Sequence, residues 1–182
     1  VMLASVCGLA QAGEKLVFGV SLMSLRHPFF QEMKDEMEKT AKELGVVVRL
    51  TDADFDAGKQ VLQIDDFAQQ KVSAIVIAPC DSKAVGPALQ KAIAAGIPVV
   101  TGDGAAEGGD VGGHCASGNV AGGRLAGELL TGRLKERGLD SGVVLIVDHV
   151  GVTSCAQRGQ GFRDAFAENG ISIAFPQLDV HF

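Results

Sequence analysis

The chain has 182 residues, 47% of them hydrophobic, and carries a formal net charge of −6 at pH 7. This is enough apolar material for one large or two small domains with real cores, and it is well above disordered composition. With 16 basic against 22 acidic residues and no long charged run, the chain lacks the basic patch that binds nucleic acid or acidic membranes.

The first twelve residues differ from the rest of the chain. Residues 1–12 are apolar, uncharged and end in Ala10-Gln11-Ala12, which has the A-x-A form of a signal-peptide cleavage site. The stretch is far shorter than the roughly 20 residues of a membrane span. We therefore expect a signal remnant cleaved after Ala12 and an exported protein without direct membrane insertion. An ordinary apolar strand or helix is the alternative.

Three cysteines remain after that cleavage, namely Cys80, Cys115 and Cys155. They show no C-x-x-C spacing and no nearby histidine, so we expect no metal site. An odd count allows one disulfide at most. Each lies among small apolar residues, and we predict buried free thiols that pack as small hydrophobic groups.

The region 13–117 alternates short aliphatic runs with amphipathic stretches. We predict strands over 16–23, 46–50, 74–78 and 97–101, a brief strand within 111–116, and helices over 28–44, 58–70 and from Asp81 or Ser82 to Ala95. The inward faces of the first two helices are expected to carry Phe30, Met33, Met37, Ala41 and Leu44, and Val61, Leu62, Ile64 and Phe67 or Ala68. Uninterrupted Val and Ile strands belong in a parallel sheet that is covered on both faces. Strands and helices in this alternation predict right-handed crossovers and a doubly wound α/β lobe.

A second α/β unit is expected over 118–182. Here we predict helices over 120–137 and 154–168 and strands over 143–148 and 171–175. Two strands and two helices bury too little surface for a stable lobe. We therefore expect the second lobe to be incomplete, the remainder lying beyond Phe182 or coming from another chain.

Polar residues gather after the predicted strands, where open α/β sheets bind their ligands. The segments there are 24–30, 79–82, 102–104 and 149–154, and Arg158 follows on the next helix. Asp103 offers acceptor oxygens and Arg158 a rigid set of donors. Phe29 and Phe30 lie roughly 100° apart on a helix, so one can enter the core while the other faces the cleft.

These residue types suit a small polyhydroxyl compound, whose C–H faces lie on aromatic rings and whose hydroxyls need acceptors and donors. Each residue also has a structural alternative: the phenylalanines as core, Asp103 as a turn former and Arg158 as a solvated helix residue.

Enzyme signatures are absent from the sequence. There is no G-x-S-x-G, P-loop or H-E-x-x-H motif, and Gly159-Gln160-Gly161 lacks the third glycine of a dinucleotide loop. His114, His149 and His181 have no evident acid or nucleophile partner in the sequence. We expect no enzyme and no cofactor; an α/β enzyme that uses His149 or Cys155 is a rival hypothesis.

Five ordered motifs resemble a known family, the type I periplasmic solute-binding proteins of the ribose-binding branch, from Lys15 to the end of the chain. They are His27-Pro28-Phe29-Phe30, the segment 78–85, the segment 96–103 ending in Asp103, Ala116-Ser117-Gly118-Asn119 with Gly122-Gly123, and Arg158-Gly159-Gln160-Gly161-Phe162.

The resemblance implies a periplasmic binding component of an ABC importer for a monosaccharide or polyol. His27 would lie at the ligand site, Phe29 and Phe30 would sandwich the sugar, Asp103 would accept its hydroxyls, and Arg158 would donate from the second lobe. The partner would be an ABC permease, or alternatively a chemoreceptor or sensor kinase.

The same resemblance places the first hinge crossing between the lobes at Ser117 and Asn119. It also implies further strands beyond this chain, so we expect residues 13–182 alone to bind sugar weakly or not at all.

Three positions depart from the family pattern. His27 and Ala78 each replace an asparagine, and Gly104 stands where ribose binders have an arginine beside the aspartate. The change at Gly104 removes a pair of donors and argues against ribose itself, which leaves another pentose, a hexose or a polyol. The effector domain of a LacI-type repressor is a further rival, since it shares the fold; it needs an N-terminal helix-turn-helix where this chain has a signal-like segment.

Overall fold

The computed structural model describes residues 15–139, 144–149 and 151–170, so the predicted signal remnant at 1–12 lies outside the described residues. The elements in chain order are β1 (Val17–Leu22), α1 (Pro28–Leu44), β2 (Val47–Asp52), α2 (Ala57–Gln69), β3 (Ala74–Ile77), α3 (Gly86–Ala94), β4 (Val99–Gly102), β5 (Gly113–Cys115), α4 (Asn119–Glu136) and α5 (Thr153–Glu168). No helix within the described part of the chain is long and apolar enough to cross a membrane.

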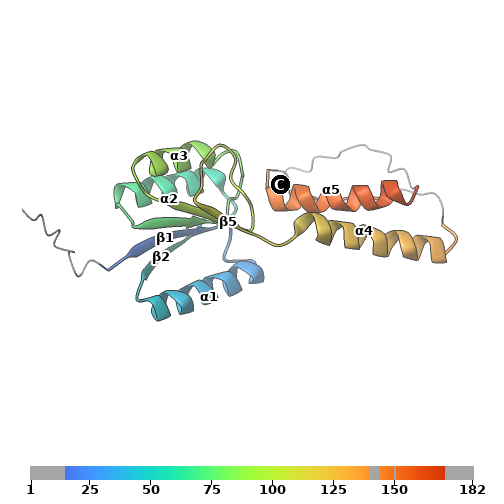
Figure 1. The fold of residues 1–182 in the computed structure, drawn as a ribbon, viewed down its shortest axis with the longest axis horizontal. Helices are drawn as coiled ribbons and strands as arrows, with labels where there is room; N and C mark the ends of the chain where they lie inside the picture. The colour runs from blue at the N-terminus through green and yellow to red at the C-terminus, as the bar shows by residue number, and fades with distance from the viewer. Residues whose placement is uncertain (1–14, 140–143, 150, 171–182) are drawn as a thin grey trace, which may run out of the picture.

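The five strands form one sheet in the order β2-β1-β3-β4-β5, and every neighbouring pair is parallel. Helices α2 and α3 cover one face, and α1 lies on the other (Figure 1). This confirms the predicted doubly wound α/β sheet. All strands point the same way, so their carboxyl ends lie along one edge of the sheet.

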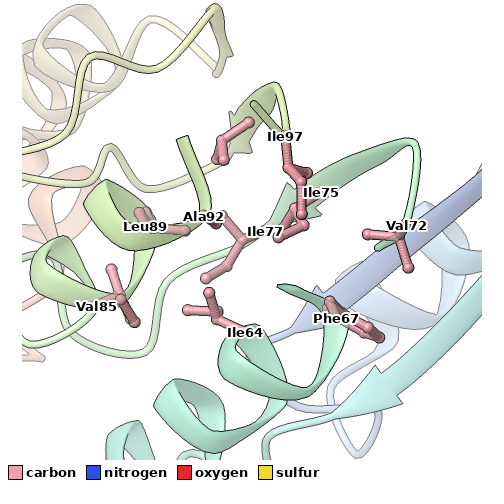
Figure 2. Close-up of a cluster of buried hydrophobic side chains, with 11 residues drawn as sticks. Ile64, Phe67, Val72, Ile75, Ile77, Val85, Leu89, Ala92 and Ile97 are labelled. Atoms are coloured by element: carbon pink, nitrogen blue, oxygen red, sulfur yellow. The ribbon is translucent and has the colours of Figure 1, made fainter. Parts of the chain in front are cut away.

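The larger hydrophobic core lies between the sheet and the helices α2 and α3. It consists of Ile64, Phe67, Val72, Ile75, Ile77, Val85, Ala88, Leu89, Ala92, Ile97 and Val99. Figure 2 shows the side chains of α2 and α3 grouped around Ile77 of β3, which is fully buried. Complete burial of such an aliphatic side chain stabilises the fold by about 1.5–3 kcal/mol, so this layer holds the lobe together.

The α1 face of the sheet is covered only in part. Two residues of α1, Phe30 and Ala41, are buried. Leu44 at the end of the helix, which we expected to point inward, is 71% exposed. A groove of about 460 Å³ runs from α1 across the sheet to Val100 and Cys115. Helix α1 therefore covers one side of this face and leaves apolar sheet residues beside it accessible.

Two details of the first lobe differ from the prediction. Helix α3 begins at Gly86 rather than at Asp81 or Ser82. The Asp81 carboxylate instead accepts hydrogen bonds from the backbone N–H groups of Lys83 and Ala84, both at 2.8 Å, and closes a turn. Pro87 lies in the first turn of α3, where its missing N–H needs no partner within the helix, so it suits a helix that begins at Gly86.

Helix α2 also turns a different face inward. Leu62 was expected in the core and is 66% exposed, while Gln60 is fully buried. The Gln60 side chain donates to Ser21 Oγ (3.1 Å) and to the Ala78 carbonyl (3.0 Å), and its oxygen accepts from the Cys80 N–H (2.7 Å). Because all of its hydrogen-bonding groups find partners, the amide can replace an apolar side chain in the core.

Helices α4 and α5 form a pair that lies beside the sheet lobe (Figure 1). Glycines allow their backbones to touch: a Cβ atom on Gly123 would lie 1.9 Å from the Arg158 carbonyl oxygen, and one on Gly161 would lie 2.0 Å from that of Val120. On the outside of α4, Leu125 and Leu129 are 57% and 63% exposed. The pair thus packs through its backbones and leaves large apolar side chains on its surface.

The strand predicted over 143–148 is wrong for its described part, since residues 144–148 adopt no regular secondary structure. Leu145 and Val147 are 78% and 81% exposed there. A strand exists only when its backbone bonds to a neighbouring strand, and no described residue pairs with this segment in a sheet. The strand predicted over 171–175 lies outside the described residues.

Candidate ligand-binding site

The loop after β1 leads into α1 through His27. Its Nδ1 accepts a hydrogen bond from the Phe29 N–H at 3.2 Å, so His27 caps the helix, and Pro28 occupies the first turn. Proline suits this place because the first N–H groups of a helix have no partner inside the helix. The exposed imidazole of His27 lies at the carboxyl edge of the sheet, where it was predicted to lie.

Phe29 and Phe30 point in different directions. Phe30 is 5% exposed and packs in the core, whereas Phe29 is 45% exposed. Their ring centroids lie 5.1 Å apart at an interplanar angle of 81°. One phenylalanine therefore enters the core and the other is exposed, as expected. That Phe29 faces a ligand cleft, and that both rings sandwich a sugar, stay predictions. The ring of Phe29 offers an open face, and that of Phe30 supports it edge-on.

Asp103 follows β4 and lies at the contact between the two parts of the chain. Its backbone is left-handed, with φ of 60°, and its N–H bonds to the Cys115 carbonyl at 2.9 Å. The Ser154 hydroxyl donates to Oδ2 at 3.4 Å, and Arg158 Nη2 lies 3.7 Å from Oδ1. The carboxylate therefore faces groups from the start of α5.

The charges at this contact differ in their access to solvent. The Asp103 side chain is only 10% exposed, while that of Arg158 is 49% exposed. Long contacts of 3.4 and 3.7 Å leave the carboxylate oxygens with unused acceptor capacity. An acceptor and a donor set side by side in this way can bind the hydroxyl groups of a small neutral molecule.

A second contact across the same junction involves two rings. Phe55, in the loop after β2, lies with its ring centroid 6.2 Å from that of His149 at an interplanar angle of 32°. Phe55 is 45% exposed and has a left-handed backbone with φ of 60°. Sequence reasoning missed Phe55, although a lone phenylalanine between Asp54 and Asp56 at the end of a strand was a usable signal. It also missed Ser154 as an individual side chain, although it identified the segment.

The predicted hinge residues follow β5. Ser117 is exposed, and its carbonyl accepts from the Asn119 N–H at 2.8 Å. Asn119 is 4% exposed and begins α4, yet neither polar atom of its side chain has a hydrogen-bond partner among the described residues. A buried amide without partners costs about 1–3 kcal/mol of stability, so Asn119 is a local weak point at the crossing.

The three cysteines occupy three environments, and all three are free thiols. Cys80 is buried, and burial raises the pKa of its thiol to about 12. Cys155 is half-buried, and its pKa is also raised by burial. Cys115 is exposed, so the prediction that all three are buried is wrong for Cys115. The cause is the partly covered α1 face of the sheet, on which Cys115 lies.

Within residues 15–139, 144–149 and 151–170, no three His, Cys, Asp or Glu side chains cluster in a way that could hold a metal ion. The groups that meet here are hydrogen-bond donors, acceptors and aromatic rings from two parts of the chain, located at the carboxyl ends of parallel strands. Open α/β sheets bind small molecules outside the carboxyl ends of their strands, so these groups form a candidate ligand-binding site.

Similarity to known proteins identifies the family of this chain. Residues 18–180 match the family described as periplasmic binding protein domain, and the chain belongs to that family. The ribose import binding protein of Bacillus subtilis (strain 168) is 38% identical over 170 residues, which cover 92% of this chain and 54% of that protein. The predicted resemblance to the ribose-binding branch is thereby confirmed.

Solved structures agree with this assignment. The Caulobacter myo-inositol binding protein bound to myo-inositol has a TM-score of 0.78 at 32% identity, covering 91% of this chain and 56% of that one. A carbohydrate transporter solute binding protein from Agrobacterium radiobacter in complex with D-arabinose has a TM-score of 0.79 at 25% identity, covering 87% and 56%. The chain spans about half the length of the curated relatives it matches. These relatives are named as binding proteins, in line with the prediction of a binding protein rather than an enzyme.

Proposed function

We propose that this chain is the periplasmic sugar-binding component, or a part of it, of an ABC importer for a monosaccharide or polyol. The observation that carries the proposal is the position of Asp103, which closes β4 of the first lobe and faces Ser154 and Arg158 of α5. Acceptors and donors from two lobes meeting at one point are what a clamp for a hydroxylated molecule requires.

The ligand class is argued from the chemistry of the site. A polyol offers hydroxyl hydrogens to the Asp103 carboxylate and hydroxyl oxygens to Arg158. The exposed ring of Phe29 suits a face of C–H groups. The relatives and neighbours are named for ribose, myo-inositol and D-arabinose. Gly104 supplies no donor beside Asp103, which favours a pentose other than ribose, a hexose or a polyol.

Export and partners follow from the same family membership. We propose that residues 1–12 are a signal remnant removed after Ala12 and that the protein works in the periplasm. An ABC permease is the proposed partner, with a chemoreceptor or sensor kinase as the alternative. The names of the matched relatives favour an import receptor over a LacI-type effector domain or an α/β enzyme.

The proposed lobes are residues 13–117 and 118–182, with the crossing at Ser117 and Asn119. The position of this crossing between β5 and α4 supports the division. Rotation about it would carry Arg158 toward or away from Asp103.

Titration calorimetry of the 182-residue chain with D-ribose, D-arabinose, xylitol and myo-inositol tests the proposal. Residues 13–182 alone were expected to bind sugar weakly or not at all. Because this chain already brings Arg158 to Asp103, we expect weak but saturable binding of at least one of the four compounds. Replacing Asp103 by Asn or Arg158 by Ala removes a hydrogen bond to a charged group, worth about 1.5–3 kcal/mol, so the affinity should fall about 10- to 100-fold.

Two variants away from the site serve as matched controls. Asp65→Asn on α2 and Arg133→Ala on α4 remove the same charges from ion pairs with Lys91 and Glu136, away from the site, and should leave the affinity unchanged. No binding of any of the four compounds, or equal affinities in the Asp103 and Arg158 variants, would contradict the proposed site.

A further inference from the structure

The start of α5 is held against the first lobe by backbone contacts to Ser82. The Ser82 N–H donates to the Gly151 carbonyl at 2.8 Å, and the Thr153 N–H donates to Ser82 Oγ at 3.2 Å. Ser82 is 1% exposed, so both hydrogen bonds are shielded from water. Ser82 thus connects the loop after β3 to the first turn of α5.

The Thr153 side chain makes a second connection. Its hydroxyl accepts from the Ala105 N–H at 2.7 Å and lies 3.4 Å from the Ala105 carbonyl oxygen, to which it can donate. Ala105 is two residues after Asp103, and Thr153 precedes Ser154. One hydroxyl therefore ties the loop that carries Asp103 to the helix that carries its partners.

Close packing accompanies these hydrogen bonds. Val152 is 2% exposed and packs into the first lobe with core residues that include Met23 and Phe30. Gly151 has a φ of +91°, and a Cβ atom on it would lie 2.5 Å from an oxygen of Asp81. Only glycine fits this approach, so residues 151–153 are shaped to the surface of the first lobe.

We propose that Thr153 and Ser82 are positioning residues of the ligand site, which hold the two lobes in register so that Asp103 stands opposite Ser154 and Arg158. This inference rests on the proposed function and adds a determinant of lobe closure to it. Neither residue is among those that we assigned to the ligand.

The contacts of Thr153 and Ser82 should shift the equilibrium between the open and closed arrangements of the two lobes. The contacts of Thr153 and Ser82 join protein atoms directly, so they stabilise the closed arrangement whether or not a sugar is bound. If only a fraction of the molecules adopts the closed, binding-competent arrangement, the apparent affinity is reduced by that fraction. Loss of the Thr153 hydroxyl should therefore weaken binding without removing any group that faces the sugar.

Amide hydrogen exchange by NMR tests the connection at single residues. Thr153→Val keeps the shape and removes the hydroxyl, so exchange of the Ala105 amide should become about two- to tenfold faster. Thr153→Ser keeps the hydroxyl and should restore slow exchange. Ser82→Ala should accelerate the Thr153 amide in the same way. Thr51→Val is the matched control, since Thr51 bonds to Val20 within the sheet lobe and should leave the Ala105 amide unchanged.

Sugar titration of the same variants tests the positioning role. Thr153→Val should bind the best of the four compounds about two- to tenfold more weakly, and Thr153→Ser should match the wild-type chain. Unchanged exchange at Ala105 in Thr153→Val overturns the inference. So does faster exchange with unchanged affinity, because the contact would then position nothing.

The two proposals can fail separately. A wild-type chain that binds none of the four compounds defeats the proposed function, and the Ala105 and Thr153 amides still report whether these residues hold the lobes together.

Discussion

The sheet lobe and the α4–α5 pair are held together in opposite ways. In the sheet lobe, large aliphatic side chains such as Ile75, Ile77 and Leu89 are completely buried between layers. In the helix pair, Phe166 is buried as well, but the two helices meet through Gly123 and Gly161, which have no side chains and let backbone touch backbone. The first arrangement gains stability from buried area, the second from close fit.

The two kinds of contact are therefore sensitive to opposite kinds of substitution. A core of large side chains loses stability when atoms are removed from it, since a cavity remains. A glycine contact fails when an atom is added, since neither backbone can yield easily. In the helix pair, Phe166 of α5 is fully buried, but Leu125 and Leu129 of α4 are exposed, so less buried apolar area offsets such a change than in the sheet lobe.

The largest effect is expected in the sheet lobe. Ile77→Ala removes buried atoms between α2, α3 and the sheet and should lower the free energy of unfolding by about 2–5 kcal/mol. Urea unfolding followed by circular dichroism measures this. Leu62→Ala, on the exposed side of α2, should change it by less than about 0.5 kcal/mol. Equal losses in the two variants would contradict the layer assignment.

A smaller effect is expected in the helix pair. Gly123→Ala places a methyl group against the Arg158 carbonyl and should destabilise the α4–α5 contact by about 1–3 kcal/mol. Its neighbour Gly122 faces open space, so Gly122→Ala should stabilise α4 by roughly 0.5–1 kcal/mol through helix propensity. Amide exchange of α5 distinguishes the two variants. If both behave alike, the glycine contact is not what holds the pair.

The smallest effect concerns pH. The Arg124 guanidinium donates to the Glu168 carboxylate and lowers the pKa of Glu168 below its ordinary value of 4.5. A carboxyl with a lowered folded-state pKa contributes stability above its unfolded value and loses it as the pH falls through the folded one. The difference in unfolding free energy between the wild-type chain and Glu168→Gln should thus shrink as the pH falls below 4.5. A difference that stays constant from neutral to acidic pH would argue against this ion pair.

Local signals made the sheet lobe predictable. The strands β1, β3 and β4 are short aliphatic runs bounded by glycine, proline or polar residues. Such runs can be recognised from the local sequence alone. The segment 144–148 carries the same signal, but a strand also depends on a hydrogen-bonded neighbour that its own residues cannot specify. The position of Gln60 also depends on distant residues. Gln60 is buried, and Leu62 exposed, because the hydrogen-bond partners of Gln60 lie on β1 and after β3.

The site could be predicted in part. Asp103 was identifiable because it stands after β4, and Arg158 because it lies on the helix after the strand predicted over 143–148. Although that strand is absent from its described part, the structure brings the two residues together. The contacts of Ser82 and Thr153 were not predictable, since they depend on how the start of α5 packs against the sheet lobe. The hydrophobic periodicity of a single helix or strand does not predict contacts between separate parts of the chain.

The left-handed backbone at Asp103 restricts how this site could be adapted to a new ligand. With a φ of 60°, position 103 favours Asp, Asn or Gly, whereas other residues pay roughly 1–2 kcal/mol. The carboxylate can therefore be exchanged for an amide or for glycine without this cost. Retargeting would have to draw on neighbouring positions such as Gly104, whose backbone is not left-handed and whose missing Cβ would make only ordinary contacts with Val152 and Pro79.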